Sequence, residues 1–573
     1  IMPVKKIKKG EEEIRICSLG GLEEIGRNLM FLEHIKDNQE KGDILIIDAG
    51  LKFPEEDTPG IDYIIPNIEY LTNNKERIKG IIITHGHYDH IGAIPYIIEK
   101  LGNPPIFTSP LTSAIIKKRQ EEFPHLPKLN INLFYQNYQG KKTKIGIFEV
   151  TPFHINHNIP DNLGLFIKTP LGNIIHSGDF KFDFQPVGDK PFDPREIISL
   201  SAKGIKLLLA DSTGAENPGH SISEKIIYEN LEKVFEKAKG RIIAATFASL
   251  ISRIQQLIWL SEKFSRYVVI DGFSMKTNME VARQLGYLSI KKRTLISPKE
   301  ANSLPPEKVT IICTGSQGED QAVLMRIANK EHRYFQIQPG DLVILSSSVV
   351  PGNERSVQYL KDSLARQGAD IFHYKMMDIH ASGHAYQEDL KLFISMIKPK
   401  YFLPIHGHFS MLKMAGNLAK EMGIPQERII LPTNGQIVKM TKKEVFLTKE
   451  FLPANYVLVD GLGVGDVGEI VLRDREILAK DGIFVIIAVI NSQIGKVKGS
   501  PDIISRGFVY LRESKELLAE VRKLTKEIVA KTASRERTKN WAYVKANLRD
   551  KIGEFLYQKT QRRPMVLPVI IEV

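Results

Sequence analysis

Three imidazoles and one carboxylate fall within six residues of this chain, in the stretch Thr84-His85-Gly86-His87-Tyr88-Asp89-His90. The stretch directly follows the apolar run Ile81–Ile83, which is typical of a buried strand, and it precedes a segment with helical spacing. Loops at the carboxyl ends of strands are the usual position of sites in α/β folds. Four N and O donors so close together suit two neighbouring metal ions better than one tetrahedral ion. The sequence therefore predicts a metal-binding loop, and the alternative is a surface cluster of histidines.

The composition is that of a soluble globular protein with several domains. The 573 residues are 42% hydrophobic and 25% charged, and this length predicts three or four domains. The net charge of +12 favours a polyanionic partner such as nucleic acid. Cys17 and Cys313 are the only cysteines, which excludes a disulfide framework or a thiolate zinc finger and favours a reducing, cytoplasmic setting. No apolar run approaches the roughly 20 residues of a membrane helix, so we expect no membrane contact.

The order of predicted elements divides the chain into domains. Residues 1–214 contain short strands separated by Gly-rich turns, whereas 215–372 alternate strands with helices, which predicts a parallel sheet covered on both faces. Histidine-rich loops return in 373–447, so we expect this segment to rejoin the first domain and 215–372 to be an insertion. A linker, 448–465, leads to a small basic α+β domain, 466–573. The strands predicted there are Glu469–Leu472, Phe484–Asn491, Phe508–Leu511 and Val566–Val573.

Further candidate ligands lie at the ends of other predicted strands. They are His154 and His157, then Asp179 beside Gly178, and His406 much later in the chain. A carboxylate next to glycine can bridge two cations. Taken singly, each of these residues is more often structural than a ligand, but together on strand-end loops they favour a shared metal site. Asp48 also ends an apolar run. A carboxylate in a turn or helix cap explains it as well as a place in the metal site does.

These motifs resemble known families. The Thr84–His90 stretch resembles the HxHxDH signature of the metallo-β-lactamase fold, a sandwich of two β-sheets flanked by helices that supports many activities. The inserted domain resembles the β-CASP cap of nucleic-acid-processing members, because Asp211, His384 and His406 match that group's additional motifs. Four stretches resemble the bacterial ribonuclease J family: Ser18–Asn28, His176–Asp183, Cys313–Glu319 and Pro501–Phe508. We therefore expect an α/β protein: an αββα sandwich, an inserted parallel α/β β-CASP domain and a small α+β C-terminal domain.

The resemblance implies a set of ligands for two divalent ions, zinc or manganese, with magnesium as a third choice. The implied ligands of one ion are His85, His87, His157 and Asp179, and those of the other are Asp89, His90, Asp179 and His406. Asp179 would bridge the ions, and His154 would not be a ligand. Asp48 and Asp211 would orient ligand imidazoles through hydrogen bonds.

The resemblance also implies a mechanism. Two cations would lower the pKa of a shared water, which would attack a phosphodiester in line and leave 5′-phosphate and 3′-hydroxyl ends. Asp89 and Asp179 would act in catalysis, and His384 would be the general acid or donate a hydrogen bond in the transition state. A neighbouring pocket would hold an RNA 5′-phosphate. Its predicted residues are His380, Ala381, Ser382, Gly383 and His384. The loop Gly315–Gly318 of the cap, with Ser316, is a second candidate for binding the phosphate, and an ordinary turn explains this loop equally well.

The function that these expectations favour is a cytoplasmic two-metal ribonuclease for RNA maturation and mRNA decay. It would digest RNA from 5′-monophosphate ends in the 5′→3′ direction and also cleave internally. The alternative is a DNA-directed or purely endonucleolytic β-CASP nuclease. The cap and basic tail argue against a small-molecule hydrolase, and the complete ligand set argues against an inactive RNA-binding scaffold. RNA is the expected partner, with a homodimer or homotetramer formed through 466–573 and an RNA helicase or degradosome as a further partner.

Overall fold

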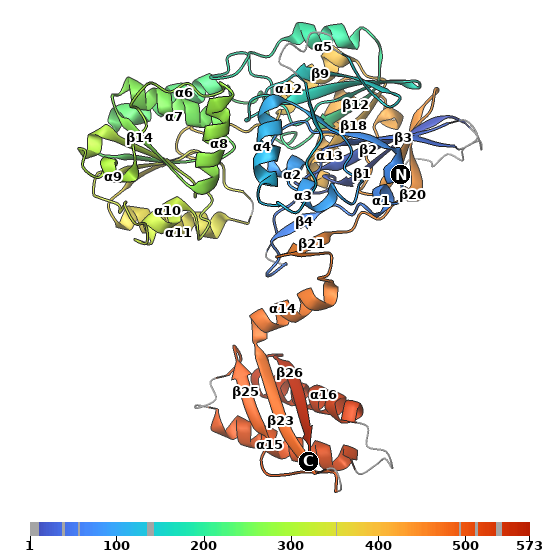
Figure 1. The fold of residues 1–573 in the computed structure, drawn as a ribbon, viewed down its shortest axis with the longest axis vertical. Helices are drawn as coiled ribbons and strands as arrows, with labels where there is room; N and C mark the ends of the chain where they lie inside the picture. The colour runs from blue at the N-terminus through green and yellow to red at the C-terminus, as the bar shows by residue number, and fades with distance from the viewer. Residues whose placement is uncertain are drawn as a thin grey trace. The chain divides into compact units, whose positions relative to one another are not determined.

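The computed structural model describes most of the chain as two compact units. The described residues are 11–36, 40–55, 58–134, 142–350, 352–491, 494–509, 514–533 and 541–573. The larger unit comprises residues 1–53 and 64–457, and the smaller unit comprises 54–63 and 458–573. Figure 1 shows the larger unit from blue through green and yellow to orange and the end of the chain in red. Among the described helices, none is long and apolar enough to cross a membrane.

Two β-sheets form the first part of the larger unit. One has eight strands in the order β20-β19-β1-β2-β3-β5-β6-β7, and the other has six in the order β18-β12-β11-β10-β9-β8. The strands of the eight-stranded sheet are β1 (Glu13–Gly20), β2 (Leu29–Ile35), β3 (Lys41–Ile47), β5 (Ile78–Ile82), β6 (Ile106–Thr108), β7 (Ile131–Leu133), β19 (Gln436–Met440) and β20 (Val445–Phe451). Those of the six-stranded sheet are β8 (Thr143–Ile145), β9 (Phe148–His154), β10 (Leu163–Thr169), β11 (Gly172–His176), β12 (Ile205–Asp211) and β18 (Tyr401–Ile405).

The apolar faces of the two sheets pack against each other. One buried cluster takes residues from both sheets, including Leu45 and Ile82 from the first and Leu165 and Leu207 from the second. A second cluster joins the outer face of the six-stranded sheet to its covering helices, with Phe393 at its centre. The helices of this part are α1 (Glu69–Thr72), α2 (Tyr88–Ile91), α3 (Ile94–Ile97), α4 (Pro110–Gln120), α5 (Pro194–Ser201), α12 (Gln387–Ile397) and α13 (Phe409–Glu421). The arrangement is the predicted αββα sandwich.

The pairing of β12 with β18 spans the inserted domain. The two strands are parallel neighbours, with Asp211 opposite Ile405, although almost 200 residues of chain separate them. The chain therefore leaves the sandwich at the end of β12 and returns to the same sheet beside it. His406, the residue after β18, is thereby brought next to the end of β12. A non-local strand pair of this kind is what closes the site described below.

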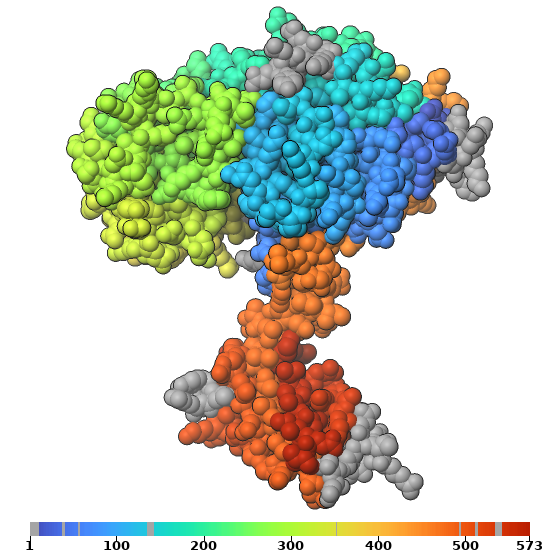
Figure 2. Space-filling model, viewed as in Figure 1, coloured from blue at the N-terminus to red at the C-terminus, as the bar shows by residue number. Residues whose placement is uncertain are grey.

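The inserted domain is built on a five-stranded parallel sheet, as the alternating pattern predicts. Its order is β14-β15-β13-β16-β17, and all four of its strand pairs are parallel. The strands are β13 (Ile242–Ala245), β14 (Tyr267–Asp271), β15 (Val309–Cys313), β16 (Leu342–Leu345) and β17 (Asp370–His373). The helices are α6 (Glu224–Lys237), α7 (Ile251–Lys263), α8 (Phe273–Gln284), α9 (Pro298–Ala301), α10 (Val323–Ala328) and α11 (Glu354–Arg366). Figure 2 shows this domain, in green, packed against the blue segment that carries α4, where α4 contacts α8.

A buried ionic network lies where the chain passes into the inserted domain. The carboxylate of Glu224, at the start of α6, accepts hydrogen bonds from Arg253 at 2.7 Å and from Gln256 at 2.9 Å, and it lies 3.3 Å from the ammonium of Lys181. Arg253, only 1% exposed, also donates to the carbonyl of Ile379, where the chain returns to the sandwich. One arginine of the inserted domain is therefore tied to both connecting segments.

The smaller unit has a sheet of β23 (Ile483–Asn491), β24 (Lys496–Val497), β25 (Asp502–Arg506) and β26 (Met565–Glu572), and its helices are α14 (Glu469–Asp481), α15 (Lys515–Ala533) and α16 (Trp541–Thr560). Helices α15 and α16 pack on one face of this sheet around Phe484 and Leu548. Three short strands are β4 (Tyr63–Ile65), β21 (Val457–Asp460) and β22 (Gly463–Val464).

One predicted strand of this unit is wrong and another is only partly described. Residues Glu469–Leu472 begin helix α14 and are not a strand. A short apolar run does not distinguish a strand from a helix, and the following residues up to Lys480 are strong helix formers. In the predicted strand Phe508–Leu511, the first two residues are not in a strand, and the last two lie outside the described residues.

We predict that Glu224→Ala destabilises the inserted domain by about 3–5 kcal/mol, because it leaves the guanidinium of Arg253 buried without its carboxylate. Burial alone would raise the pKa of Glu224, but Arg253 and Lys181 lower it below its usual value. The stabilisation is therefore present above the unfolded pKa of about 4.3 and is lost as the pH falls below it. Urea unfolding followed by the fluorescence of Trp259 on α7, in a Trp541→Phe background, measures the effect.

The matched control is Glu232→Ala, which removes a carboxylate of the same helix from an ion pair with the exposed Lys263. Exposed pairs contribute about 0–1 kcal/mol, so this variant should unfold close to the parent. Equal unfolding midpoints for Glu224→Ala and Glu232→Ala would contradict the prediction.

Candidate metal centre and active site

The ends of neighbouring parallel strands bring the predicted site residues together. Strands β3 and β5 are parallel neighbours, so Asp48 after β3 lies beside the loop that begins at Thr84 after β5. The Oδ1 of Asp48 accepts a hydrogen bond of 2.8 Å from the backbone N–H of Thr84. Asp48 and His406 both have positive φ angles, 62° and 54°. This backbone conformation is uncommon for non-glycine residues and is concentrated at functional sites.

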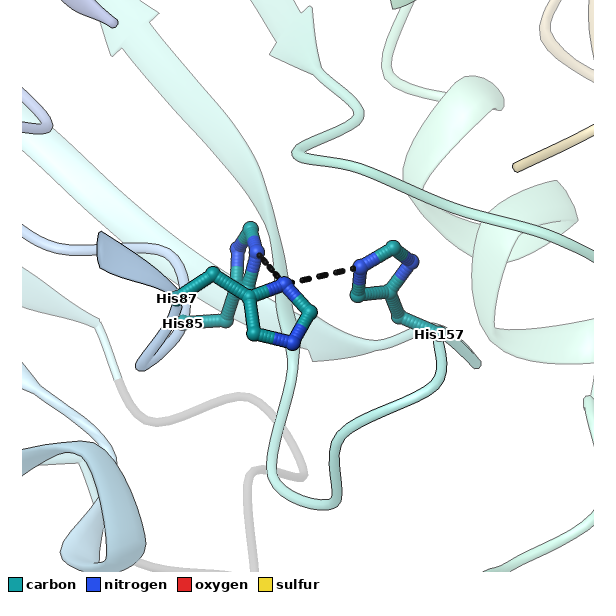
Figure 3. Close-up of side chains that lie close together, drawn as sticks. All are labelled: His85, His87 and His157. Carbon is teal, nitrogen blue, oxygen red and sulfur yellow. Dashed lines mark hydrogen bonds between the residues drawn. The ribbon is translucent and has the colours of Figure 1, made fainter. Parts of the chain in front are cut away.

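Three imidazoles form the first donor group (Figure 3). His85 and His87 come from the loop after β5, and His157 comes from the loop between β9 and β10. The Nδ1 of His87 lies 3.0 Å from the Nε2 of His85 and 3.3 Å from the Nε2 of His157. Ligands about 2.0–2.1 Å from a tetrahedral zinc ion lie about 3.3–3.4 Å from one another. The three nitrogens therefore have the spacing of a metal shell.

A second donor group contains two carboxylates and two imidazoles: Asp89, His90, Asp179 and His406. The Nε2 of His90 lies 3.4 Å from Asp89 Oδ2 and 3.3 Å from Asp179 Oδ2. The Nε2 of His406 lies 3.3 Å and 3.6 Å from the same two oxygens. These distances are again those between ligands of one ion. His406 joins the group only because β18 pairs with β12.

Asp179 lies between the two groups. Its Oδ2, which faces His90 and His406, is also 3.9 Å from His85 Nε2 and 4.0 Å from His157 Nε2. Asp179 is 3% exposed and follows Gly178, whose φ is +62°. An added Cβ at Gly178 would lie 2.6 Å from the carbonyl oxygen of Leu163, so glycine is required for this turn. The chemistry of the donors, their burial and their spacing all fit divalent metal binding.

The pKa values of the histidines differ between the two donor groups. Burial lowers the pKa of His87 to about 4, and burial is also the main cause that lowers the pKa values of His85 and His157. These imidazoles are therefore neutral near pH 7, the form that binds metal. Burial also acts to lower the pKa of His406, but the carboxylates of Asp179, Asp211 and Asp89 raise it to about 10. The carboxylates around His90 likewise outweigh its burial and raise its pKa.

Four family models match this chain. A β-lactamase superfamily domain matches residues 44–222, and a Zn-dependent metallo-hydrolase RNA specificity domain matches 372–432. A ribonuclease J β-CASP domain matches 239–364, and a ribonuclease J C-terminal domain matches 470–573.

Full-length relatives agree with these matches. The chain is 40% identical to ribonuclease J 1 of Streptococcus pyogenes serotype M3 over 98% of each chain. It is 37% identical to ribonuclease J2 of Bacillus subtilis over 99% of this chain and 100% of that one. The chain belongs to the ribonuclease J family. The predicted resemblance, the fold class and the class of metal-dependent ribonuclease are thereby confirmed.

A solved structure supports the fold alone. The crystal structure of a protein of unknown function from Enterococcus faecalis V583 is 16% identical and has a TM-score of 0.50. It covers 76% of this chain and 100% of its own.

Hydrogen bonds from outside the donor groups orient two of the imidazoles, those of His90 and His157. The Nδ1 of His90 lies 2.8 Å from Asp48 Oδ2, the position predicted for a carboxylate that orients a ligand. The Nδ1 of His157 lies 2.6 Å from the carbonyl oxygen of Gly383. An added Cβ at Gly383 would lie 2.4 Å from the ring of His157, so this contact requires glycine. In metal sites, such partners set the tautomer and the ring orientation of ligand imidazoles.

His384 and Asp211 form a pair beside the donor groups. The Nδ1 of His384 lies 2.7 Å from Asp211 Oδ2, whereas the Nδ1 of His406 lies 3.6 Å from Asp211 Oδ1. Asp211 therefore contacts the predicted general acid more closely than the ligand imidazole. Burial acts to lower the pKa of His384, but Asp211 outweighs it and raises this pKa. A donor atom of His384 also lies within 4.8 Å of those of His157 and Asp179.

The predicted phosphate-binding residues fall in two places. In the loop 380–384, the backbone N–H of His384 donates to the hydroxyl of Ser382 at 3.2 Å, and Ala381 is buried. Burial lowers the pKa of His380 to about 3, so its imidazole is neutral, and its Nδ1 has no hydrogen-bond partner among the described residues. Ser316 lines a different cavity, in the inserted domain.

His154, predicted not to be a ligand, lies outside both donor groups. Its Nε2 is 3.2 Å from the carbonyl oxygen of Lys190.

Two residues near the donors were not singled out from the sequence. The amide nitrogen of Asn28 lies 3.3 Å from Asp89 Oδ2 and 3.1 Å from His90 Nε2. The hydroxyl of Thr213 lies 2.6 Å from the Nδ1 of His406. Asn28 ends the motif Ser18–Asn28, and Thr213 follows the motif residue Asp211 by two positions, but only the fold shows which side chain each one contacts.

We predict that Asp48→Asn weakens metal binding about 10- to 100-fold, because an amide is a poorer partner for the Nδ1–H of His90. Competition with a chromophoric chelator measures this affinity. Asp193→Asn, at the exposed start of α5, is the control and should bind metal as the parent does. An unchanged affinity in Asp48→Asn would contradict the assigned role.

We also predict that metal binding releases protons, and that these come from the second donor group. His406 and His90 have raised pKa values and carry protons near pH 7 without metal, so metal affinity there should rise with pH up to about 10. Titration calorimetry in buffers of different ionisation enthalpy counts the protons. His406→Gln should release fewer, whereas His87→Gln should release as many as the parent, and equal counts in all three proteins would contradict the prediction.

Proposed function

We propose that this chain is a two-metal ribonuclease that digests RNA from a 5′-monophosphate end in the 5′→3′ direction and also cleaves internally. The observation that supports it best is the single carboxylate oxygen of Asp179 facing two donor groups in a member of the ribonuclease J family. We propose zinc or manganese as the ions, with magnesium as a third choice.

The donors suit this chemistry. Divalent cations held there would supply a water of lowered pKa and compensate the charge that grows on the phosphate. His384 donates a proton, or a hydrogen bond, to the leaving 3′-oxygen, because Asp211 raises the pKa of its imidazole and fixes its orientation from 2.7 Å. Asp89 and Asp179 hold the donor geometry, and Asp48 and Thr213 hold the imidazoles of His90 and His406.

The 5′-phosphate would lie against the loop 380–384. This loop offers the hydroxyl of Ser382 and backbone amides beside His384, and Gly383 ties it to His157. A phosphate held there would set the distance between the RNA end and the reacting phosphodiester, which favours stepwise digestion. His380 is neutral, so it would line the phosphate pocket without adding positive charge to it. Ser316 is not part of this proposal, because it lines a separate cavity.

A homodimer or homotetramer would form through the smaller unit. Several of its apolar side chains are exposed, and Ile470 on α14 is 79% exposed. Val471 and Leu478 of the same helix are exposed as well, and a contiguous patch of such side chains marks a protein interface. A helicase or degradosome partner and a cytoplasmic setting stay predictions that rest on the family resemblance and on composition.

The test uses 5′-monophosphate RNA, the matched 5′-triphosphate RNA and the matched DNA, each with manganese, zinc or magnesium. We expect mononucleotides to be released from the monophosphate RNA, with slower internal cleavage of the triphosphate RNA. Asp89→Ala should abolish the reaction, and His384→Ala should slow it about 10²- to 10⁴-fold. His154→Ala, which removes an imidazole outside the donor groups, is the matched control and should keep full activity.

Internal cleavage alone, or cleavage of DNA, would favour the alternative β-CASP nuclease. Absence of phosphodiester cleavage with every metal would overturn both.

A further inference from the structure

A cavity of about 280 Å³ lies in the inserted domain, apart from the metal donors. It opens at the carboxyl ends of β15, β16 and β17, and none of its lining residues belongs to a donor group. In open parallel sheets this end is where ligands bind. The volume is close to the lower end of the range for small-molecule sites, about 300–1,000 Å³, so one small ligand fits and an RNA duplex does not.

The polar wall of the cavity is cationic. Lys361 on α11 and Lys375 after β17 both line it, together with His373 at the end of β17. Within the described stretches, neither ammonium group lies within 4.0 Å of a carboxylate oxygen, and that of Lys375 lies 5.9 Å from the ring centroid of Tyr374. Burial, followed by the charges of Lys361 and Lys375, lowers the pKa of His373. The two ammonium groups therefore act on the same space, and an anion placed there would be stabilised by both.

One carboxylate, that of Glu354, also lines the cavity. Its Oε2 accepts a hydrogen bond of 2.9 Å from the backbone N–H of Gly352, which fixes its position. Among the described residues that line the cavity, two lysines stand against this one carboxylate, so the lining is positive.

The loop that contributes Ser316 to the lining is held by the side-chain amide of the next residue, Gln317. The side chain of Gln317 donates to the hydroxyl of Ser347 at 3.0 Å and to the carbonyl of Ser348 at 2.8 Å, and it accepts from the backbone N–H of Val350 at 2.8 Å. Gly318, with φ +74°, packs so closely against Ser356 that an added Cβ would lie 2.7 Å from that residue's backbone. The loop that carries the hydroxyl of Ser316 is therefore fixed, and hydroxyl donors line a preformed site.

The remaining lining suits a base and a sugar. Leu345 and Val357 provide an apolar surface, and the ring of Tyr374 lies beside Lys375, with the ammonium 5.9 Å from the ring centroid. Aromatic rings stack on nucleobases without regard to sequence. Ammonium and hydroxyl donors next to an apolar and aromatic surface match a nucleotide, with its phosphate on the lysines.

We propose that this cavity is a second ligand site, which binds the phosphate and base of one nucleotide. The nucleotide is either free or part of an RNA strand, and both sources present the same chemistry. The site is separate from the metal centre, so binding does not require hydrolysis.

The test is equilibrium dialysis of the full chain with UMP, AMP or inorganic phosphate. The variant Lys361→Gln/Lys375→Gln should bind UMP and AMP at least about tenfold more weakly, because two charge-assisted contacts are lost. The control Lys299→Gln/Lys308→Gln removes the same charge from exposed positions of the same domain and should bind as the parent does. Tyr374→Leu should weaken binding of UMP and AMP but not of inorganic phosphate.

A short RNA oligomer identifies the source of the nucleotide. If Lys361→Gln/Lys375→Gln binds RNA with a larger dissociation constant than the control does, the site is occupied by the strand. If its dissociation constant for RNA is unchanged while it binds UMP more weakly, the site is occupied by a free nucleotide. Equal binding of every ligand by the two double variants overturns the proposal. RNA hydrolysis, measured in parallel, shows that each variant is folded. If the parent does not hydrolyse RNA, this result overturns only the proposed function and not the proposed ligand site.

Discussion

The carboxylate of Asp179 is the interaction on which the site depends. One oxygen of this side chain is within 4.0 Å of ring nitrogens from four histidines. Burying such a charge is costly unless cations or hydrogen bonds compensate it. Burial acts to raise the pKa of Asp179, but His406 and His90 lower it. Without metal, protonated imidazoles compensate the carboxylates, and bound metal would take their place.

The position of Asp179 depends in turn on the six-stranded sheet. Strands β11, β12 and β18 are parallel neighbours, and their ends carry Asp179, Asp211 and His406 in adjacent positions. An insertion between β12 and β18 leaves this arrangement intact as long as both connecting segments are held. The buried contacts of Arg253 with Glu224 and Ile379 hold them. The inserted domain is therefore tied to the sandwich at the same point where the site closes.

Much of the fold could be predicted from local patterns. The histidine-rich loop after β5, the parallel sheet of the insertion and the pairing of the returning chain with the first domain were expected from periodicity and histidine density. The predicted strand Glu469–Leu472 was wrong, because these residues begin helix α14. A run of four residues is too short for its apolar pattern to distinguish a strand from a helix. Ser316 and the loop 380–384 were both candidates for binding phosphate, and Ser316 lines a cavity in the inserted domain. A motif indicates which side chains are functional, but it does not show which of them line the same site in the folded protein.

The sequence by itself determined the donor types, their places at strand ends and, through its resemblance to ribonuclease J, the family. It could do so because ligand chemistry and strand periodicity are local properties of a few consecutive residues. Only the tertiary structure decided that Asp179 faces both donor groups, that Asp211 contacts His384 more closely than His406, and that Lys361 and Lys375 act on one cavity. These relations depend on strand pairings and packing between residues far apart in the chain, and no local pattern carries them.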